Sequence, residues 1–374
     1  MTRYTITAAA ALLATTSIVS AGGVERSAQS MAILFEDRNY VELSYTQVSP
    51  DISGETVTSG GFPVAGIGSG DMADTYNDIE FRYHHVLSDS LSFSLIADSP
   101  IGADVSYPDG TGYPFQTANG TIESRSLSVI FRHEMPSNVS VYGGLRMVTA
   151  EGEVFLPAIP PAAPVSYALD AEGSDEIGFV LGAAYERPDI ALRVALTYHS
   201  ATTHTFTGSE TYDGVTVLPT EFDVTIPQSL TLEAQTGVAE GTLVFGSVRW
   251  VDWTEFAIQG DNGILDSPVL VDYDNDTFTY TLGAARRLTD EFAVLGSVSY
   301  EASTGGFSGN LGPTDGRFGL SLGARYDSGD WRLSGGVNYS WIGDAETEAG
   351  TISPLASFTD NSALGFQLRV GYSF

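Results

Sequence analysis

In RFGLSLGARYDSGDWRLSGGVNYSWI, residues 317–342, two segments of strict alternation flank a short polar turn. In the first segment Phe318 and Leu320 share one face, while Arg317 and Arg325 lie on the other. Alternation with a period of two is the pattern of a β-strand with one apolar and one polar face. The turn DSGD carries Gly and Asp, which hairpin turns favour. The stretch therefore predicts an antiparallel hairpin of two long strands.

The same alternation recurs along the rest of the chain. Runs bounded by Gly, Pro, Asp and Ser number fourteen, namely 39–48, 76–86, 90–106, 122–135, 138–152, 176–187, 189–200, 228–238, 241–258, 272–288, 291–302, 316–327, 330–343 and 362–374. Connections after even-numbered runs are short, whereas those after odd-numbered runs are long, as in 49–75, 153–175, 201–227 and 344–361. An antiparallel barrel with short turns at one rim and long loops at the other gives this alternation. We therefore expect an all-β protein, a 14-stranded antiparallel barrel with both ends on the short-turn rim.

Composition limits the environment of this barrel. The chain has 374 residues, no cysteine and only 17% charged residues, which is low for a soluble protein. It has 47 acidic residues and 16 basic ones, all arginine, for a formal net charge of −31, which argues against nucleic acid as a partner. The acidic residues gather in 170–176, 272–276 and 343–348, which we expect to be solvated loops. No apolar run in the body of the chain reaches the roughly 20 residues of a membrane helix.

The first residues have the pattern of an export signal. Arg3 precedes a small apolar segment, residues 8–19, and Val19-Ser20-Ala21 fits a small-x-small cleavage site. An exported chain without cysteine has no disulfide framework. The expected division of the chain is a signal peptide (1–21), a short N-terminal hatch or plug (22–38) and the barrel (39–374).

Two environments suit strands with one apolar face. A soluble barrel or sandwich buries that face, whereas a membrane barrel turns it toward lipid and keeps a polar lumen. The export signal, the aromatic residues near strand ends and the alternation of short turns and long loops favour the outer membrane of a Gram-negative bacterium. Closure also leaves no strand edge unpaired in hydrocarbon.

The positions of the arginines agree with a membrane barrel. Those on the polar parity of their runs are Arg82, Arg132, Arg146, Arg193, Arg249, Arg325, Arg332 and Arg369. An arginine facing lipid near mid-bilayer would cost about 2–4 kcal/mol. Glu80, Glu233 and Gln235 share the lumenal parity and offer hydrogen-bond partners. The arginines can therefore form a structural ladder with carboxylates, or one of them can contact a ligand.

Several runs resemble a known family of outer-membrane proteins. They are SPIGADVSY (99–107), IPQSLTLEAQTGV (226–238), TLVFGSVRWVDWTEF (242–256), YTLGAARRLTDEFAVLGSVSYE (280–301) and residues 313–345. In their order and spacing they are similar to the FadL-type transporters of long-chain fatty acids and aromatic hydrocarbons. The resemblance covers most of the mature chain and is densest from Pro227 onward.

This resemblance implies a fourteen-stranded barrel that carries hydrophobic molecules passively, with no cofactor. Members of the family capture ligand at the extracellular loops and release it sideways where a kinked third strand leaves a gap, and an N-terminal hatch fills the lumen. Pro100 and Gly102 in the third run are the candidates for the kink, because Pro and Gly interrupt strand ladders. An ordinary strand end near the rim is the alternative.

The connection EVFLPAIPPAAPVSYAL, residues 153–169, is the candidate for extracellular capture, because it is apolar where the other long connections are polar. Exposed apolar patches usually mark contact surfaces. The candidate ligand contacts are Val154, Phe155, Leu156, Ile159 and Val165. Packing of the connection against the barrel rim would explain the same composition.

Two features depart from the family. Only about seventeen residues separate Ala21 from the first strand, far fewer than a full hatch, and the usual Asn-Pro-Ala is not present there. The basic residues that bind a ligand carboxylate in the family also do not carry over, because Glu151 and Asn275 stand at those positions. Arg132 and Arg146 are the nearest head-group candidates by parity, and an uncharged ligand fits equally well.

Other functions find less support in the sequence. The five histidines are scattered without HxH or HExxH spacing, so we expect no metal site, and no constellation indicates an enzyme. A general diffusion porin and a structural or adhesive barrel remain alternatives to a hydrophobic channel. The expected partners of a monomer are hydrophobic small molecules, outer-membrane lipid and lipopolysaccharide, and the barrel assembly machinery.

The closing residues QLRVGYSF, 367–374, have the pattern of a last strand, with Leu368 and Val370 on the lipid side. This strand is expected to pair with residues 41–45 and so to close the barrel. The resemblance implies that Tyr372 and Phe374, on the same face, are the signal that the assembly machinery reads.

Overall fold

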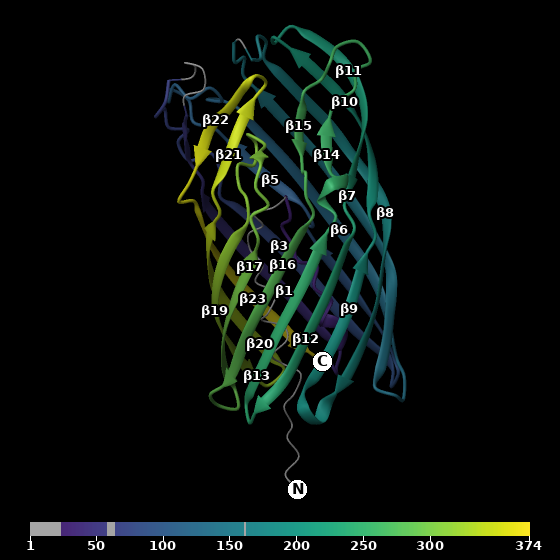
Figure 1. The fold of residues 1–374 in the computed structure, drawn as a ribbon. Helices are drawn as coiled ribbons and strands as arrows, with labels where there is room; N and C mark the ends of the chain where they lie inside the picture. The colour runs from purple at the N-terminus through teal and green to yellow at the C-terminus, as the bar shows by residue number, and fades with distance from the viewer. Residues whose placement is uncertain (1–23, 58–63, 161) are drawn as a thin grey trace.

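A closed antiparallel barrel is the main feature of the computed structural model, which describes residues 24–57, 64–160 and 162–374 (Figure 1). The predicted count of fourteen strands is confirmed if β4 and β5 are taken together as the third strand. The barrel strands are β1 (Tyr40–Asp51), β3 (Tyr76–Ser88), β4 (Leu91–Asp98), β5 (Gly102–Ser106), β6 (Asn119–Glu134), β7 (Val139–Leu156), β8 (Tyr167–Arg187), β9 (Leu192–His199), β12 (Ser229–Ala239), β13 (Thr242–Val251), β16 (Thr277–Arg287), β17 (Phe292–Glu301), β19 (Arg317–Ser328), β20 (Trp331–Ile342) and β23 (Ser362–Ser373). The signal peptide predicted for residues 1–21 lies outside the described residues.

The seam of the barrel lies between β1 and β23. These strands pair along their whole length, from Tyr40 opposite Ser373 to Asp51 opposite Ser362, with Tyr45 opposite Leu368. The predicted closure of the last strand on residues 41–45 is therefore confirmed. No strand edge remains at the seam, which is a requirement for a sheet in hydrocarbon.

Further strands elaborate the rim opposite the tight turns (Figure 1). They are β2 (Gly54–Thr56), β10 (Thr202–Tyr212), β11 (Thr216–Ile226), β14 (Ala257–Gln259), β15 (Val269–Asp272), β18 (Phe307–Ser308), β21 (Ala345–Ala349) and β22 (Ile352–Phe358). The 3₁₀ helices of the described chain are η2 (Ala32–Phe35), η3 (Pro188–Ile190) and η4 (Trp253–Glu255). Among the described residues, no helix is long and apolar enough to cross a membrane.

The predicted connections at this rim are confirmed only in part. The connections 201–227 and 344–361 are long, as expected, and they contain the hairpins β10–β11 and β21–β22. The connection 153–175 is much shorter, because β7 continues to Leu156 and β8 begins at Tyr167. The acidic stretch 170–176 therefore lies within β8 and not in a loop, because β7 and β10 supply main-chain partners beyond the barrel wall.

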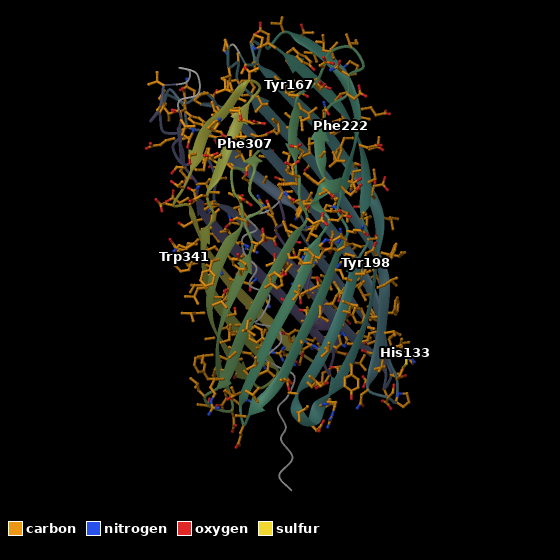
Figure 2. The ribbon with its side chains drawn as sticks, in the orientation of Figure 1. His133, Tyr167, Tyr198, Phe222, Phe307 and Trp341 are labelled. Carbon is orange, nitrogen blue, oxygen red and sulfur yellow. The ribbon has the colours of Figure 1, made fainter. Side chains whose placement is uncertain are left out.

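The two faces of the strands have the polarity of a membrane barrel. Large apolar side chains stand exposed on the outside, for example Ile177 at 68% and Leu43 at 54%, and Figure 2 shows Trp341 projecting from the outer surface. The eight arginines of the polar parity point inward, and Arg82 and Arg369 are 2% and 3% exposed. Lipid favours apolar side chains on the outer face, so the predicted partition of the faces is confirmed.

Ion pairs line the lower lumen, which is the part nearer the tight turns. Arg82 contacts Glu80 at 2.8 Å and Glu42 at 3.4 Å, and Arg325 contacts Asp327 at 2.7 Å. Buried charges require such partners, because an isolated ion in a low-dielectric interior is strongly destabilising. The lower lumen is consequently polar.

Residues 24–36 run through this lumen. All four residues of η2 are buried, and Phe35 lies beneath the guanidinium groups of Arg193 and Arg132, at 4.3 Å and 4.7 Å from its ring centroid. Ion pairs fix both ends of the segment, since Arg249 donates to Glu25 at 2.9 Å and Arg332 to Glu36 at 2.7 Å. The segment therefore fills lumenal space in the range predicted for the plug.

Candidate functional site

The barrel wall is broken in its third strand, at Pro100. β4 ends at Asp98 and β5 begins at Gly102. β4 pairs with both β3 and β6, whereas β5 pairs with β6 and, among the described strands, not with β3. Since β3 pairs with β4 only from Phe81 onward, residues 77–80 of β3 face the break. We call the stretch of wall between residues 77–80 and residues 99–102 the wall break.

The wall break has closed ends. The bridge between Ala73 and Val105 joins the wall again on the extracellular side. On the other side β3 and β4 pair from Phe81 opposite Ala97. One side-chain hydrogen bond crosses the break itself, because the hydroxyl of Ser99 donates to the carboxylate of Asp78 at 2.7 Å. The break is therefore a bounded gap in the main-chain ladder and not an open edge.

The N-terminal segment covers the wall break from inside. The backbone N–H of Arg26 donates to the carbonyl of Pro100 at 3.0 Å, and that of Gly102 donates to Val24 at 2.8 Å. The Arg26 guanidinium then pairs with Asp104 and lies 3.7 Å from the centroid of the Tyr76 ring. Arg26 thus contacts both β3 and β5, the two strands that do not pair.

Glycine at position 102 makes this closure possible. A Cβ atom there would lie 2.6 Å from Nε of Arg26, which is closer than non-bonded atoms approach. A larger residue would therefore displace the Arg26 side chain. Proline at position 100 removes a backbone N–H, so this position has no donor for a ladder hydrogen bond.

An apolar pocket of about 50 Å³ lies behind the wall break, and we call it the inner pocket. Phe206 and Phe222 stack in its wall with ring centroids 5.6 Å apart. Ile101, from the wall break itself, is another lining residue and is 5% exposed. The other lining side chains are mainly apolar, and they include Ile122, Ala150, Val154, Leu169, Ala171, Val224, Ile226, Phe256 and Ile258.

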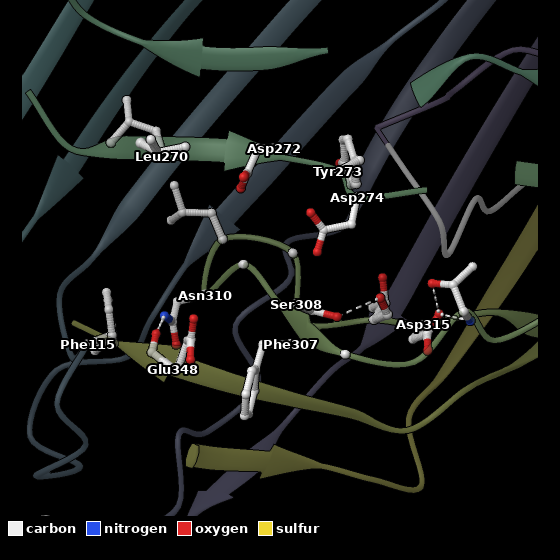
Figure 3. Close-up of a pocket in the computed structure, with 18 of the residues that line it drawn as sticks. Phe115, Leu270, Asp272, Tyr273, Asp274, Phe307, Ser308, Asn310, Asp315 and Glu348 are labelled. Atoms are coloured by element: carbon white, nitrogen blue, oxygen red, sulfur yellow. Dashed lines mark hydrogen bonds between the residues drawn. The ribbon is translucent and has the colours of Figure 1, made fainter. Parts of the chain in front are cut away.

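A larger cavity of about 640 Å³ opens between the extracellular loops, and we call it the mouth cavity (Figure 3). Its apolar lining includes Phe115, Ile159 and Phe307, and its polar lining includes Asp272 and Asp274. Tyr273 also lines it, and burial together with the neighbouring Asp272 carboxylate raises the pKa of this phenol. Tyr273 therefore remains neutral in the physiological pH range.

Leucines connect the two cavities. Leu156 and Leu311 line the mouth cavity and pack against both apolar clusters of the upper barrel. Leu270 lines the mouth cavity as well, and it belongs to the same buried cluster as Phe206 and Ile101. Apolar side chains therefore extend without interruption from the mouth to the wall break.

The structure brings together some of the predicted ligand contacts. Val154 lines the inner pocket, whereas Leu156 and Ile159 line the mouth cavity. Phe155 and Val165 line neither of these two cavities, and Val165 is 44% exposed. Residues 153–156 belong to β7 and not to a loop, so neighbouring side chains alternate between the inside and the outside.

Neither arginine proposed for a ligand head group lines these two cavities. Arg132 pairs with Glu186 and Glu134 near the tight turns, and Arg146 donates to Gln29 of the lumenal segment. The residues that sequence reasoning missed are Arg26, the Phe206–Phe222 pair and Leu311. Arg26 and Leu311 carry no local signal, because their contacts are distant in sequence. The Asp213-Gly214 turn, in contrast, could have indicated the β10–β11 hairpin in which Phe206 lies opposite Phe222.

The fold and these cavities define an integral β-barrel of the outer membrane. The family model for outer membrane protein transport protein (OMPP1/FadL/TodX) matches residues 21–374, so the chain belongs to this family, which is a family of transport proteins. A search of curated proteins finds no match.

Solved structures show the same fold. A Pseudomonas aeruginosa FadL homologue matches with a TM-score of 0.77 and 16% identity over 92% of each chain. The Pseudomonas putida toluene transporter TodX matches with a TM-score of 0.66 and 14% identity over 91% of each chain. The Ralstonia pickettii toluene transporter TbuX gives 0.63 and 15%, again over 91% of each chain.

Proposed function

We propose that this protein is a passive channel that carries hydrophobic small molecules across the outer membrane. The ligand enters at the mouth cavity, passes into the inner pocket and leaves sideways into the membrane through the wall break. One observation carries the proposal: Ile101 belongs to both the wall break and the inner pocket. The names of the similar structures, which include toluene transporters, support small aromatic hydrocarbons as substrates.

Physical chemistry favours the sideways exit. Below the inner pocket the ligand would meet ion pairs such as Arg82–Glu80 and the lumenal segment 24–36. An apolar molecule there would lose about 25 cal/mol for each Å² of its surface that is again exposed to a polar or aqueous environment. Beyond the wall break lies lipid, where this loss does not occur. The short N-terminal segment would then suffice as a plug.

The proposal is tested by filling the inner pocket. Ala150 is 4% exposed and lines it, so Ala150→Leu should lower uptake of radiolabelled ethylbenzene about tenfold, since overpacking a filled site costs about 1–3 kcal/mol. Uptake is measured in a Gram-negative host strain that lacks its own channel of this family. Ala234→Leu, on the lipid-facing side of β12, is the matched control. Equal uptake by wild type and Ala150→Leu at equal barrel levels would refute the inner pocket as the route.

A swelling assay separates this channel from a general porin. Proteoliposomes containing the wild-type protein should not swell in isotonic sugar, because segment 24–36 occupies the lumen. Swelling at a porin-like rate would favour the porin alternative. An adhesive barrel would instead lose surface attachment on deletion of residues 157–166, with ethylbenzene uptake unchanged.

A further inference from the structure

We infer that the mouth cavity selects ligands by charge: it favours hydrophobic molecules whose polar group donates hydrogen bonds, above all an ammonium group, and it disfavours carboxylates. The inference rests on the proposed function, because it concerns what the same cavity admits.

The first observation is the charge of the lining. The carboxylates that line the mouth cavity are Asp272, Asp274, Glu301, Asp315 and Glu348. No arginine or histidine is among the described residues that line it, and the chain has no lysine. A cleft lined by charges of one sign concentrates counter-ions and repels ions of its own sign. An anionic ligand therefore meets repulsion at entry.

The described residues that line the inner pocket also include carboxylates but no basic side chain. Glu151 and Glu153 are its charged lining residues, and no basic side chain of the described chain lines it. Asn275, at the other position where a basic residue could receive a carboxylate, lines the mouth cavity. Neither cavity on the proposed route therefore offers a cation to an anionic head group.

The second observation is a buried acceptor without a donor. Glu301 is 2% exposed, and its Oε2 accepts from the Thr279 hydroxyl at 2.8 Å and forms a buried ion pair with Nε of Arg317 at 3.8 Å. Its Oε1 has no hydrogen-bond partner among the described residues. Leaving a buried acceptor unsatisfied is destabilising, so a donor supplied by a ligand would be favoured there.

A second acceptor of the same cavity lacks a donor. The amide of Asn310 donates through Nδ2 to the carbonyl of Glu348 at 2.7 Å, while its Oδ1 has no partner among the described residues (Figure 3). Asp315 differs, because the backbone N–H groups of Thr304 and Gly305 donate to it. Among the described residues that line the mouth cavity, the buried side-chain atoms without a hydrogen-bond partner are thus acceptors, which a carboxylate cannot satisfy and an ammonium group can.

The apolar lining of the mouth cavity indicates the chemistry of the rest of the ligand. Phe115, Leu156 and Leu311 lie in the same cavity as Glu301, so the charged group of a small aromatic amine can reach the acceptors while its ring contacts apolar side chains. Cavities of this size, about 640 Å³, commonly hold small molecules in this way.

Three ligands with one phenyl tail test the inference: ethylbenzene, 2-phenylethylamine and 3-phenylpropanoate. Equilibrium binding is measured with the protein in nanodiscs at pH 7 and low salt, and binding to empty nanodiscs is subtracted. At this pH the amine is a cation and the acid an anion. The amine should bind at least about tenfold more tightly than the carboxylate, and the difference should shrink in about 1 M salt, where the Debye length falls to about 3 Å. Equal affinity for amine and carboxylate would overturn the inference.

Variants locate the effect. Glu301→Gln should weaken binding of 2-phenylethylamine about tenfold, as expected for loss of a charge-assisted hydrogen bond, and should weaken binding of ethylbenzene far less. Glu346→Gln removes the same charge at the same rim but outside the cavity, so it should change neither. If Glu301→Gln does not assemble, Asp274→Asn should produce a smaller loss in the same direction.

The binding results for these variants distinguish failure of the charge selection from failure of the proposed channel. Equal loss of amine and ethylbenzene binding in Glu301→Gln, or no loss of amine binding in either variant, would overturn the inference. Failure of the proposed function is distinguishable, since in that case ethylbenzene itself would not be taken up and Ala150→Leu would have no effect. Ethylbenzene uptake without preference between amine and carboxylate would leave the channel standing and remove only the charge selection.

Discussion

The guanidinium of Arg26 lies 3.7 Å from the centroid of the Tyr76 ring, across the place where the third barrel strand is broken. Arg26 comes from the lumenal segment and Tyr76 from β3, and the same guanidinium pairs with Asp104 of β5. One side chain therefore joins the two strands that lack main-chain pairing. We expect it to hold the wall break closed.

Removing this side chain should open the wall. In Arg26→Ala the cation–π contact and the ion pair with Asp104 are both lost, and contacts of this kind contribute about 1 kcal/mol. Ethylbenzene uptake should rise about fivefold if opening limits the rate. Uptake per folded barrel is the measurement.

Another arginine provides the control for this experiment. Arg38 pairs with Asp330 at 2.8 Å near the tight turns, and both side chains are about half exposed. Arg38→Ala removes an ion pair from the same end of the chain without touching the wall break, so uptake should stay at the wild-type rate. Equal uptake by both variants would contradict a closing role for Arg26.

Much of the fold could be predicted from the local sequence pattern. The period of two placed Arg82 and Arg369 in the lumen and Leu43 and Ile177 on the outside, because each strand needs only its own alternation to choose a face. The seam followed from the apolar face of residues 368–374 and the even count of runs. The alternation of short turns and long connections then sufficed to order the strands around the barrel.

The candidate site could be predicted only in part. Pro100 and Gly102 stand out because of their backbone chemistry, and their place in the wall break is visible in the structure, whereas their role as a gate stays a prediction. Arg26 could not be assigned, since its partner Asp104 is 78 residues away. Residues 153–156 lack the alternation that predicts a strand, because a strand that continues beyond the membrane loses its single apolar face.

The extracellular hairpin β10–β11 should loosen in acid. Glu210 is 0% exposed and accepts hydrogen bonds from Ser267 at 2.6 Å, Tyr212 at 2.7 Å and Asn262 at 2.8 Å. Burial alone would raise the pKa of Glu210, but these hydrogen bonds lower it below its ordinary value of about 4.5. The stabilisation is therefore complete at neutral pH and is lost as the pH falls from about 4.5 through the lowered pKa.

Hydrogen exchange measures this effect. Protection factors of residues 210–212 and 262–267, corrected for intrinsic exchange, should fall as the pH drops below about 4.5, while those of β19 and β20 stay constant. Glu210→Gln should show the lower protection already at pH 7. Protection that is independent of pH in the wild type would refute the assignment.

The last aromatic residue should matter for assembly more than for transport. The backbone N–H of Phe374 donates to Asn39 at 2.9 Å, and its ring stacks on Tyr83 with centroids 6.3 Å apart, at the seam. Deleting Phe374 should reduce the fraction of heat-modifiable folded barrel severalfold and leave uptake per folded barrel unchanged. Trp331→Ala, which removes the ring that packs on Tyr372, should reduce assembly less. Normal barrel levels in the deletion would contradict an assembly signal at the terminus.

If ligand leaves through the wall break, a reversible covalent lock across the break should block uptake. The side chains of Asp78 and Ser99 touch across the break at 2.7 Å, and the chain contains no cysteine, so Asp78→Cys with Ser99→Cys introduces a single pair. A disulfide needs Cα atoms about 4.4–6.8 Å apart, so loss of free thiols is measured first to show that the bridge has formed. The measurement is ethylbenzene uptake by this double variant before and after reduction, with each single variant as control. We predict that uptake is blocked while the disulfide is intact and returns on reduction, whereas equal uptake in both states would show that the ligand leaves by another route.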